Sequence, residues 1–460
     1  MSKIVTSIPL PPVFYHATET SYWRRDDADR WFKVNESGAK NFVADRSYLK
    51  SPANPGTNSE VDLCLMEIQA KQNIAYVGPL AGYDAGVYRV CGNQILVTDS
   101  PQFITPKPGG WPTLDALFSG MLVDGIIDQR PYLYGWIKNA MESFRQRRWK
   151  ASQLLAMAGP VGSGKSLTQN LLTVMFGGRS AKPYMFMTGN TQFNSHMFCA
   201  EHQMLEDEAE SVDIRSRRHF ASNIKTILTG RDQNCHGKNR VALILQPRWR
   251  MSLSLNDDPE RLQVLPPLDQ DVRDKIIVLK ICKARMPMST GDPELDEQFW
   301  KKLVSEIPAF LYHLDQWQIP ENLRDDRYGI QAYHHPEIVE KLEQTSPELR
   351  LLELIDRALF NGIALGRPEP WEGSAAKLEA WLVRDHSPVQ YEARRLLTWQ
   401  NACGAYLGRL KDSDNELIKG RITKRVLHGQ TIWTIRSPLH DEPVVEDPGQ
   451  PPRPPEGLGQ

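Results

Sequence analysis

The middle of the chain alternates short apolar runs with segments of helical periodicity. Every side chain of 154–158 is apolar, as in a strand that is buried on both faces of a parallel sheet. Apolar residues then recur at helical spacing over 167–175, and two glycines follow as a helix stop. The runs 249–255 and 275–279 predict two further strands. The pattern therefore predicts an α/β fold, with a parallel sheet flanked by helices.

The flanking segments predict smaller modules around this core. Aromatic residues, several of them beside arginines, cluster near the N-terminus: Phe14-Tyr15, Tyr22-Trp23-Arg24-Arg25 and Trp31-Phe32. They indicate a small α+β module, in which these side chains either build a core or stack on bases. Near the C-terminus, helices followed by two strands about His428-Gly429 predict a winged-helix-like module, which either contacts DNA or serves packing alone.

The expected organisation follows from these segments and from Pro-rich and Gly-rich stretches between them. In chain order it is an N-terminal α+β module of unknown function (1–110), a helical segment (111–150), a phosphate-loop ATPase core (151–285), a helical C-terminal part of that core (286–370), the winged-helix-like module (371–436) and a disordered Pro-rich tail (437–460).

A complete GxxxxGKS sequence, the signature of a phosphate-binding loop, lies between the first strand and the helix. The glycines let backbone N–H groups wrap around phosphates, and the helix N-terminus adds partial positive charge. Lys165 is expected to reach the β- and γ-phosphates, and Ser166 to bind Mg²⁺. The predicted nucleotide-binding residues are Gly159, Pro160, Val161, Gly162, Ser163, Gly164, Lys165, Ser166 and Leu167. The motif predicts ATP and Mg²⁺ as cofactors, and a purely structural glycine-rich turn is the alternative.

An acidic motif follows downstream. The run 203–208 contains the apolar pair Met204-Leu205 and ends in Glu206-Asp207-Glu208. Two carboxylates at the end of a neighbouring strand can have separate roles in hydrolysis: one holds the metal ion and the other orients the attacking water. We assign Asp207 to Mg²⁺ and Glu208 to the water. If the segment is instead the solvated start of a helix, the Mg²⁺-binding role and the water-orienting role each shift to a residue one position away.

Two further polar residues lie beside the predicted strands. Asn256 closes the alternating run, where its amide can sense the γ-phosphate or hold the attacking water. Arg273 stands just before the run 275–279, and a guanidinium there can act on a neighbouring subunit's nucleotide as an arginine finger. Arg261 is the second choice for this role, and an ordinary surface ion pair is the alternative for Arg273. A finger of this kind would make hydrolysis depend on assembly.

The order of these motifs resembles the superfamily 3 helicases of viruses and phages, which are built on an AAA+ core. Within that group the ATPase half of poxvirus and phage or plasmid primase-helicases is the most similar, because the segment 224–238 resembles its K-x-x-x-T-G-D…K pattern. This chain departs from the pattern by placing Arg231 before Asp232. The resemblance covers 112–285 well. It implies a hexameric, ATP-hydrolysing DNA helicase, with 111–150 as an oligomerisation collar.

The same segment predicts a hairpin with a polar, turn-rich tip over 232–240. Cationic side chains on such a loop can grip the phosphates of a strand without regard to sequence. The resemblance assigns this DNA-binding role to His236 and Lys238, with Arg240 beside them. A solvated charged turn without a ligand is the alternative for each of the three.

Composition is consistent with a soluble protein of several domains. The chain has 460 residues, a net charge of −1 and six cysteines without a CxxC pair, so we expect a reducing cytoplasm and no structural metal. No apolar run is long enough to span a membrane. A near-neutral total does not exclude nucleic acid, because local clusters of cations make the electrostatic footprint.

The sequence therefore predicts an ATP-dependent DNA helicase motor that serves replication of a phage or other mobile element, in the cytoplasm of a bacterial host. Single-stranded or forked DNA, further copies of the chain and a primase on a separate chain are the expected partners. The competing interpretation is a nucleotide-dependent switch or assembly ATPase, with a defence or scaffold role and no unwinding activity.

Overall fold

The computed structural model describes residues 10–46, 48–52, 54–206, 214–238, 240–266, 268, 272–288, 291–344, 347–360, 369–412, 418, 420–427 and 429–437. The chain divides into two compact units, Met1–Leu342 and Glu343–Gln460. The predicted carboxylates Asp207 and Glu208 lie outside the described residues, as does the predicted tail from 438 onward. None of the described helices is both long and apolar enough to cross a membrane.

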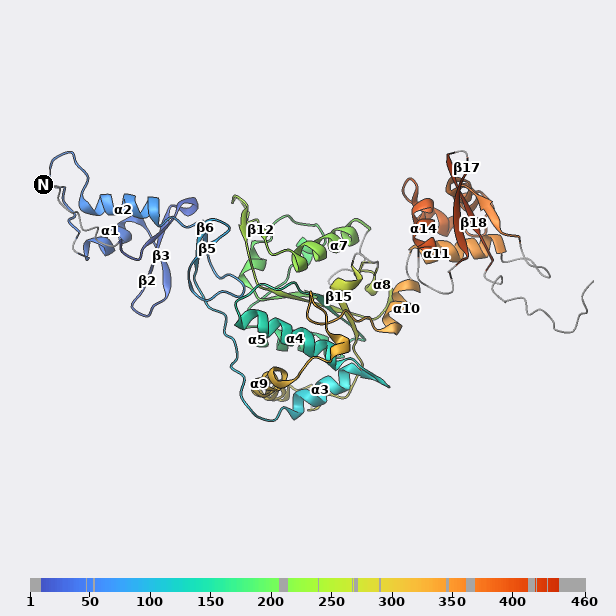
Figure 1. Ribbon diagram of the computed structural model, residues 1–460, viewed down its shortest axis with the longest axis horizontal. Helices are drawn as coiled ribbons and strands as arrows, with labels where there is room; N and C mark the ends of the chain where they lie inside the picture. Colours follow the sequence, from blue (N-terminus) through green and yellow to red (C-terminus); the bar gives the residue numbers. More distant parts are fainter. Residues whose placement is uncertain are drawn as a thin grey trace, which may run out of the picture. The chain divides into compact units, whose positions relative to one another are not determined.

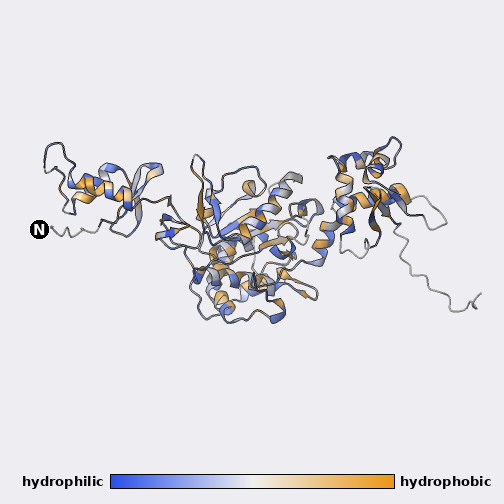
Figure 2. Cartoon of the chain, turned by 45° about the horizontal axis from the view of Figure 1, so that its top comes forward, coloured by the Kyte–Doolittle hydropathy of each residue, from blue (hydrophilic) through white to orange (hydrophobic). Residues whose placement is uncertain are grey.

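The N-terminal module is a three-stranded antiparallel sheet with two helices (Figure 1, blue). Its strands β1 (Phe14–His16), β2 (Ser21–Arg25) and β3 (Trp31–Val34) pair in that order. The helices α1 (Glu36–Ala44) and α2 (Glu60–Lys71) begin at side-chain caps and carry hydrophobic and hydrophilic residues on different faces (Figure 2). Both helices pack on one face of the sheet and enclose a core of Val13, Tyr22, Ala39, Val43, Val61, Cys64, Leu65 and Ile68.

A second small sheet follows the N-terminal module along the chain. It consists of β4 (Tyr76–Val77), β5 (Gly86–Val90) and β6 (Asn93–Val97), in the order β4-β6-β5. Leu80, Ile95 and Val97 from this segment belong to the same hydrophobic core as the central sheet. The second sheet is thus packed against the central sheet and its helices.

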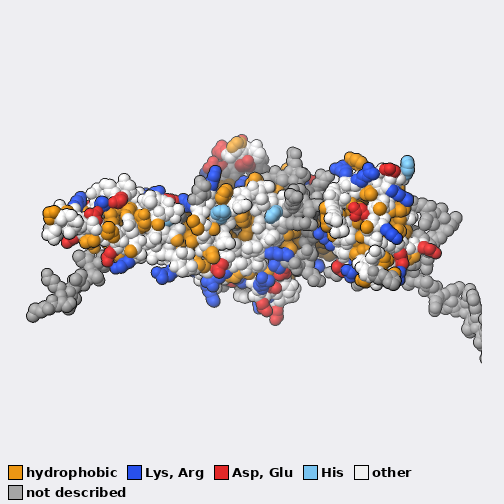
Figure 3. Space-filling model, turned by 90° about the horizontal axis from the view of Figure 1, so that it is seen from above, with side chains coloured by type: hydrophobic (Ala, Val, Ile, Leu, Met, Phe, Trp, Pro, Cys, Tyr) orange, Lys and Arg blue, Asp and Glu red, His pale blue; other side chains and the backbone are white. Residues whose placement is uncertain are grey.

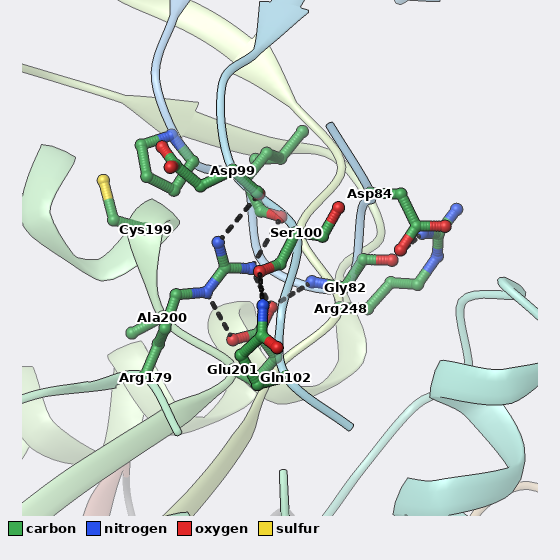
Figure 4. Close-up of polar contacts among 12 residues, drawn as sticks. Gly82, Asp84, Asp99, Ser100, Gln102, Arg179, Cys199, Ala200, Glu201 and Arg248 are labelled. Carbon is green, nitrogen blue, oxygen red and sulfur yellow. Dashed lines mark hydrogen bonds and ion pairs between the residues drawn. The ribbon is translucent and has the colours of Figure 1, made fainter. Parts of the chain in front are cut away.

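A buried ion pair anchors this second sheet (Figure 4). The fully buried carboxylate of Glu201 accepts hydrogen bonds from the Gly82 backbone N–H at 2.7 Å and from Arg179 Nε at 2.9 Å, and it also pairs with Arg179 Nη2. Arg179 donates in addition to the Asp99 carbonyl at 3.1 Å. One charge pair therefore ties both ends of the segment 82–99 to the core.

Replacing Glu201 with alanine should destabilise this region strongly. The substitution leaves the Arg179 guanidinium and the Gly82 N–H without their buried acceptor, and breaking a buried pair from one side costs about 3–5 kcal/mol. Urea unfolding measures the loss. Glu67→Ala is the matched control, because the exposed pair of Glu67 with Lys71 should contribute less than about 1 kcal/mol. Equal losses for both variants would refute the anchoring role.

The central sheet has five parallel strands, in agreement with the sequence. Across the sheet they are β10 (Ser180–Ala181), β11 (His202–Glu206), β14 (Arg250–Leu255), β9 (Leu154–Ala158) and β15 (Ile276–Lys280). β9 has the predicted bounds, and the predicted starts of β14 and β15 differ by one residue from those observed. β9 lies between β14 and β15, and all five of its residues are buried. The predicted α/β fold class is confirmed.

Helices cover both faces of this sheet (Figure 1). One face packs on α3 (Pro112–Leu122), α4 (Arg130–Arg145), α5 (Lys165–Met175) and α9 (Pro293–Gln316). The other face packs on α6 (Tyr184–Met187) and α7 (Ile214–Thr229). Leu155 and Met157 of β9 enter the first core, and Leu154, Ala156 and Ala158 enter the second. This double burial is the reason why the strand is apolar at every position.

Several short elements complete this part of the chain. They are β7 (Val123–Asp124), β8 (Ile127–Asp128), β12 (Gln233–Cys235), β13 (Leu243–Leu245), α8 (Pro259–Leu262), α10 (Pro336–Gln344) and the 3-10 turns Ala17–Glu19, Ser195–Cys199, Arg273–Lys275 and Glu321–Leu323.

The C-terminal unit has its own hydrophobic core, in which Leu378, Leu407 and Trp433 are buried. Its elements are α11 (Pro347–Ile355), a π-helical turn (Asp356–Phe360), β16 (Trp371–Gly373), α12 (Ala375–Val383), α13 (Gln390–Leu396), α14 (Ala402–Lys411), β17 (Ile422–Leu427) and β18 (Gln430–Ile435). The strands form an antiparallel sheet in the order β16-β18-β17. The hairpin β17–β18 follows the helices along the chain, and α11 contributes to the same core. The winged-helix-like assignment of this segment stays a prediction.

Candidate nucleotide site and nucleic-acid hairpin

The phosphate-binding loop connects the end of β9 to the start of α5. Gly164 caps the helix with φ +89°, a left-handed conformation that favours glycine. At Gly159 a Cβ atom would overlap the backbone carbonyl of Ile281, which follows β15. The loop is therefore held against the neighbouring strand, and its open side carries the exposed residues Val161 and Ser166. The strand, loop and helix predicted from the sequence are all present.

The ammonium group of Lys165 lies in the hollow of this loop. Its Nζ donates to the carbonyl oxygens of Gly159 at 2.6 Å and Pro160 at 2.7 Å. Two side-chain oxygens, Ser163 Oγ and Asn256 Oδ1, each lie 3.4 Å from the same Nζ. The structure thus brings together Lys165 and Asn256, which stand 91 positions apart in the sequence.

The strand order explains why these residues meet. Ala158 at the end of β9 is paired with Leu255, directly before Asn256, and Ser254 is paired with Glu206 at the end of β11. The carboxyl ends of all three strands therefore share one edge of the sheet. Glu206 is the last described residue of β11, and its carboxylate pairs with Lys182 at 2.6 Å. Glu206 at this edge is also the first carboxylate of the predicted acidic motif, whose other two members lie outside the described residues.

A buried polar network behind the loop was not predicted from the sequence. The Gln169 side chain, one turn after Lys165, donates to Ser252 Oγ at 2.9 Å and to the Leu205 carbonyl at 3.1 Å. His202 Nε2 lies 2.9 Å from the same Ser252 hydroxyl, and His202 Nδ1 lies 2.7 Å from Thr173 Oγ1. The network ties α5, the helix that follows the phosphate-binding loop, to β11 and β14. A polar residue at a buried helix position, such as Gln169, was the available signal.

This network makes stability depend on pH. Complete burial lowers the pKa of His202 to about 3, so the ring is neutral in the folded protein, whereas in the unfolded chain its pKa is near 6.5. Protonation then favours unfolding, and the stability is lost as pH falls below 6.5. At about pH 5 the loss should reach about 2 kcal/mol relative to neutral pH.

Urea unfolding of the wild type and of His202→Gln at neutral and acidic pH tests this prediction. Other histidines with lowered pKa, among them His334 and His335, contribute in the same direction in both proteins, so the difference between the two proteins isolates His202. The variant should lose less stability on acidification. An equal loss in both would contradict the assignment.

A charged cluster lies at the carboxyl end of β15, beside the loop. Lys280 is paired with Ala158 in the strand register, and its ammonium contacts Asp124 at 2.8 Å and Glu337 of α10. Lys341, also of α10, contacts Asp257 at 2.8 Å, directly after Asn256. Helix α10 is therefore held at the same edge as the nucleotide loop. Sequence reasoning missed this cluster because its members come from four separate segments of the chain.

The two arginine candidates lie on opposite edges of the sheet. Arg273 is exposed in the turn before β15, at the amino end of the parallel strands. Since β15 has five residues and a strand rises about 3.3 Å per residue, Arg273 is roughly 16 Å from the edge that carries the loop. Arg261 lies in α8, which follows the carboxyl end of β14. Arg273 is therefore at the edge opposite the loop of its own chain, whereas Arg261 follows a strand end that shares the loop's edge.

The predicted DNA-binding residues surround the turn between β12 and β13, which pair in antiparallel fashion. The His236 backbone N–H donates to Asn194 Oδ1 at 2.7 Å, and its ring lies 5.3 Å from that of Phe193. Lys238 is exposed, and Arg240 pairs with Glu19 of the N-terminal module. Figure 3 shows Lys and Arg side chains interspersed with other types over the face that it draws.

The sheet and the loop define the class of this protein: it is an α/β protein with a phosphate-binding loop at the carboxyl edge of a five-stranded parallel sheet. Its fold is shared with the NrS-1 C-terminal region. One apo structure of that region aligns with a TM-score of 0.53 at 13% identity, over 92% of this chain and 95% of the other. The A form aligns with a TM-score of 0.52, with the same identity and coverage. At this identity the likeness shows the fold.

Other comparisons add little. The active helicase SCCmec type IV Cch aligns with a TM-score of 0.31 at 10% identity, over 88% of this chain and 70% of the other, and a score this low does not establish a shared fold. No protein-family model matches the sequence, and no curated protein matches it.

Proposed function

We propose that the chain is an ATP-dependent DNA helicase motor that works as a hexameric ring. The observation that carries the proposal is the position of Lys165, whose ammonium lies inside the GxxxxGKS loop and 3.4 Å from the Asn256 amide oxygen. A cation and a polar amide at one strand edge are suited to bind and sense a γ-phosphate. The NrS-1 likeness supports the fold on which this site is built.

In the proposed reaction each residue has a separate task. Lys165 exchanges its carbonyl partners for phosphate oxygens, and the backbone N–H groups of the loop hold the remaining phosphates. Ser166 is exposed on the first turn of α5, and its hydroxyl is a suitable ligand for a hard cation; together with Asp207 it would hold Mg²⁺. Bound Mg²⁺ supplies charge neutralisation at the β- and γ-phosphates. Glu208 orients the attacking water, and Asn256 senses the γ-phosphate.

Assembly completes the site. Because Arg273 lies on the edge opposite its own loop, we assign it to the nucleotide of a neighbouring subunit. The segment 111–150, now seen as α3 and α4 with the hairpin β7–β8, is assigned to the collar between subunits. The proposal includes replication of a phage or other mobile element in a bacterial cytoplasm, with a primase on a separate chain.

DNA contact is assigned to the tip between β12 and β13. Replacing the exposed Lys238 with alanine should weaken binding of single-stranded DNA and reduce the slope of log affinity against log salt by about 0.7, the contribution of one phosphate contact. Basal ATP hydrolysis should stay unchanged while its stimulation by DNA falls. Fluorescence anisotropy and a hydrolysis assay measure both effects. Lys301→Ala, which removes an exposed cation from α9, is the control.

A double variant separates the motor from a nucleotide-dependent switch. If the protein with both His236→Ala and Lys238→Ala hydrolyses ATP with full stimulation by DNA, the hairpin does not bind the DNA strand. A wild-type protein that hydrolyses ATP without any response to DNA would favour the switch.

A further inference from the structure

The sheet of the N-terminal module has two faces of different composition. Side chains alternate between the faces of a strand, so Tyr22 and Arg24 of β2 share one face. Tyr22 is buried in the core, and the Arg24 guanidinium lies 4.4 Å from the ring centroids of Phe32 and Phe42. Helices α1 and α2 cover this inner face.

The opposite face, here called the outer face, carries aromatic and cationic residues. The strand register places Phe14 beside Trp23, Trp23 beside Lys33, and Arg25 beside Trp31. The Phe14 and Trp31 rings have centroids 5.6 Å apart, and the Arg25 guanidinium lies 4.7 Å from the Trp31 ring centroid. Within the described part of the chain, the core of the module contains none of these five residues.

The aromatic side chains of the outer face are half-buried: the indole nitrogens of Trp23 and Trp31 are enclosed, and part of each side chain remains accessible. Neighbouring strands are about 4.8 Å apart, so the three strands present aromatic surface across roughly 10 Å. Sheets with exposed aromatic residues bind unpaired bases by stacking two or three of them on the rings. Stacking requires an open π-face on the base, which a single strand offers and an intact duplex does not.

Charges on the outer face complement a phosphate backbone. Arg25 pairs with the exposed Asp29, and Lys33 pairs with Glu19 at 2.9 Å. Exposed pairs of this kind contribute about 0–1 kcal/mol, so a phosphate can replace either carboxylate at little cost. Acidic residues of the β2–β3 turn lie at the end of β2 and limit the net positive charge, so stacking must supply most of the affinity.

The outer face is continuous with the DNA-binding hairpin proposed above. Glu19, which holds Lys33, also pairs with Arg240 of the β12–β13 tip. One carboxylate thus links a cation of the outer face to a cation of the hairpin.

We propose that the outer face of β1–β2–β3 is a second binding site for single-stranded DNA. Bases stack on Trp23 and Trp31, with Phe14 at the edge of Trp31, and the phosphates pair with Arg25 and Lys33. The choice of DNA as the ligand rests on the proposed motor function, whereas stacking on single strands follows from the composition and geometry of the face.

Anisotropy of a labelled oligothymidylate, with the full chain and without nucleotide, tests the site. Trp23→Ala and Trp31→Ala should each weaken binding about tenfold, in the range known for loss of one stacked base. Trp31→Phe keeps a ring and should retain most of the affinity. The salt slope should stay unchanged in all three, unlike in Lys238→Ala. Met66→Ala, on the exposed side of α2, should bind as the wild type does.

A cross-linking experiment needs no variant and covers the case of a substitution that unfolds the module. An oligonucleotide with iodinated uracil, irradiated on the wild-type protein, should attach to peptides that contain Trp23 or Trp31. Cross-links confined to 232–245 would overturn the second site. Tryptophan variants that change the particle size by light scattering, with unchanged affinity for the oligonucleotide, would also overturn it and identify the face as a contact between subunits.

The same data keep the two proposals apart. If the tryptophan variants bind normally and Lys238→Ala binds weakly, the second site is wrong and the motor stands. If the tryptophan variants bind weakly but DNA never stimulates ATP hydrolysis, the second site stands and the motor is wrong.

Discussion

Replacing Lys165 with alanine is expected to reduce ATP hydrolysis by at least about a hundredfold, the usual cost of losing one preorganised charge at a reacting phosphoryl group. The ammonium is the cation inside the loop, and in the structure its hydrogen bonds go to the Gly159 and Pro160 carbonyls, which a nucleotide would displace. A coupled phosphate-release assay measures turnover, and equilibrium binding of a labelled nucleotide shows how much of the loss is affinity.

Two controls make the result specific. Thermal unfolding of Lys165→Ala should match that of the wild type, because the loop is held by the packing of β9 and α5 rather than by the lysine. Lys71→Ala, an exposed lysine of the N-terminal module, should hydrolyse ATP normally. Unchanged turnover in Lys165→Ala would show that ATP is not hydrolysed at this loop.

The second large effect is expected for Arg273→Ala. An arginine finger contributes about 10³–10⁵ to the rate of phosphoryl transfer, so the variant should bind ATP and hydrolyse it at least about a thousandfold more slowly. The roughly 16 Å between Arg273 and its own loop means that the loss occurs at a subunit boundary. Hydrolysis by the wild type should also rise more than linearly with protein concentration.

Mixing two inactive proteins tests the boundary directly. Arg273→Ala supplies an intact loop and Lys165→Ala supplies an intact finger, so mixed rings should recover part of the activity that neither variant has alone. Arg261→Ala is the comparison, since α8 lies on the same edge as the loop. If Arg261→Ala is inactive alone and recovers activity when mixed with Lys165→Ala, whereas Arg273→Ala does not, Arg261 is the finger. Full activity of Arg273→Ala alone would show that Arg273 has no role in hydrolysis.

Sequence patterns predicted best the parts that are determined locally. The bounds of β9 follow from five apolar residues that enter two cores, and the loop follows from glycines needed at a left-handed position and at a close approach to Ile281. Asn256 was placed because it ends an alternating strand. The structural reasons include distant contacts such as Ile281, but the signals themselves are contiguous stretches of residues, so one sequence is sufficient to find them.

The missed features depend on partners far apart in the sequence. Glu201 and Gly82 are 119 positions apart, and nothing local in either residue indicates that a buried carboxylate will hold the second sheet on the core. The same holds for Gln169 with Ser252, 83 positions apart, and for Arg240 with Glu19. Tertiary packing decides these pairs. The roles of Asp207 and Glu208 stay predictions from the sequence.

The most direct test of the proposed DNA motor is to measure ATP hydrolysis by the purified protein with and without single-stranded DNA, at low and at moderate salt. A DNA-translocating motor should show strong stimulation by DNA that weakens as salt rises, because cations of the hairpin tip displace counterions from the DNA when they bind its phosphates. Hydrolysis that is robust but indifferent to DNA at both salt concentrations would contradict the motor.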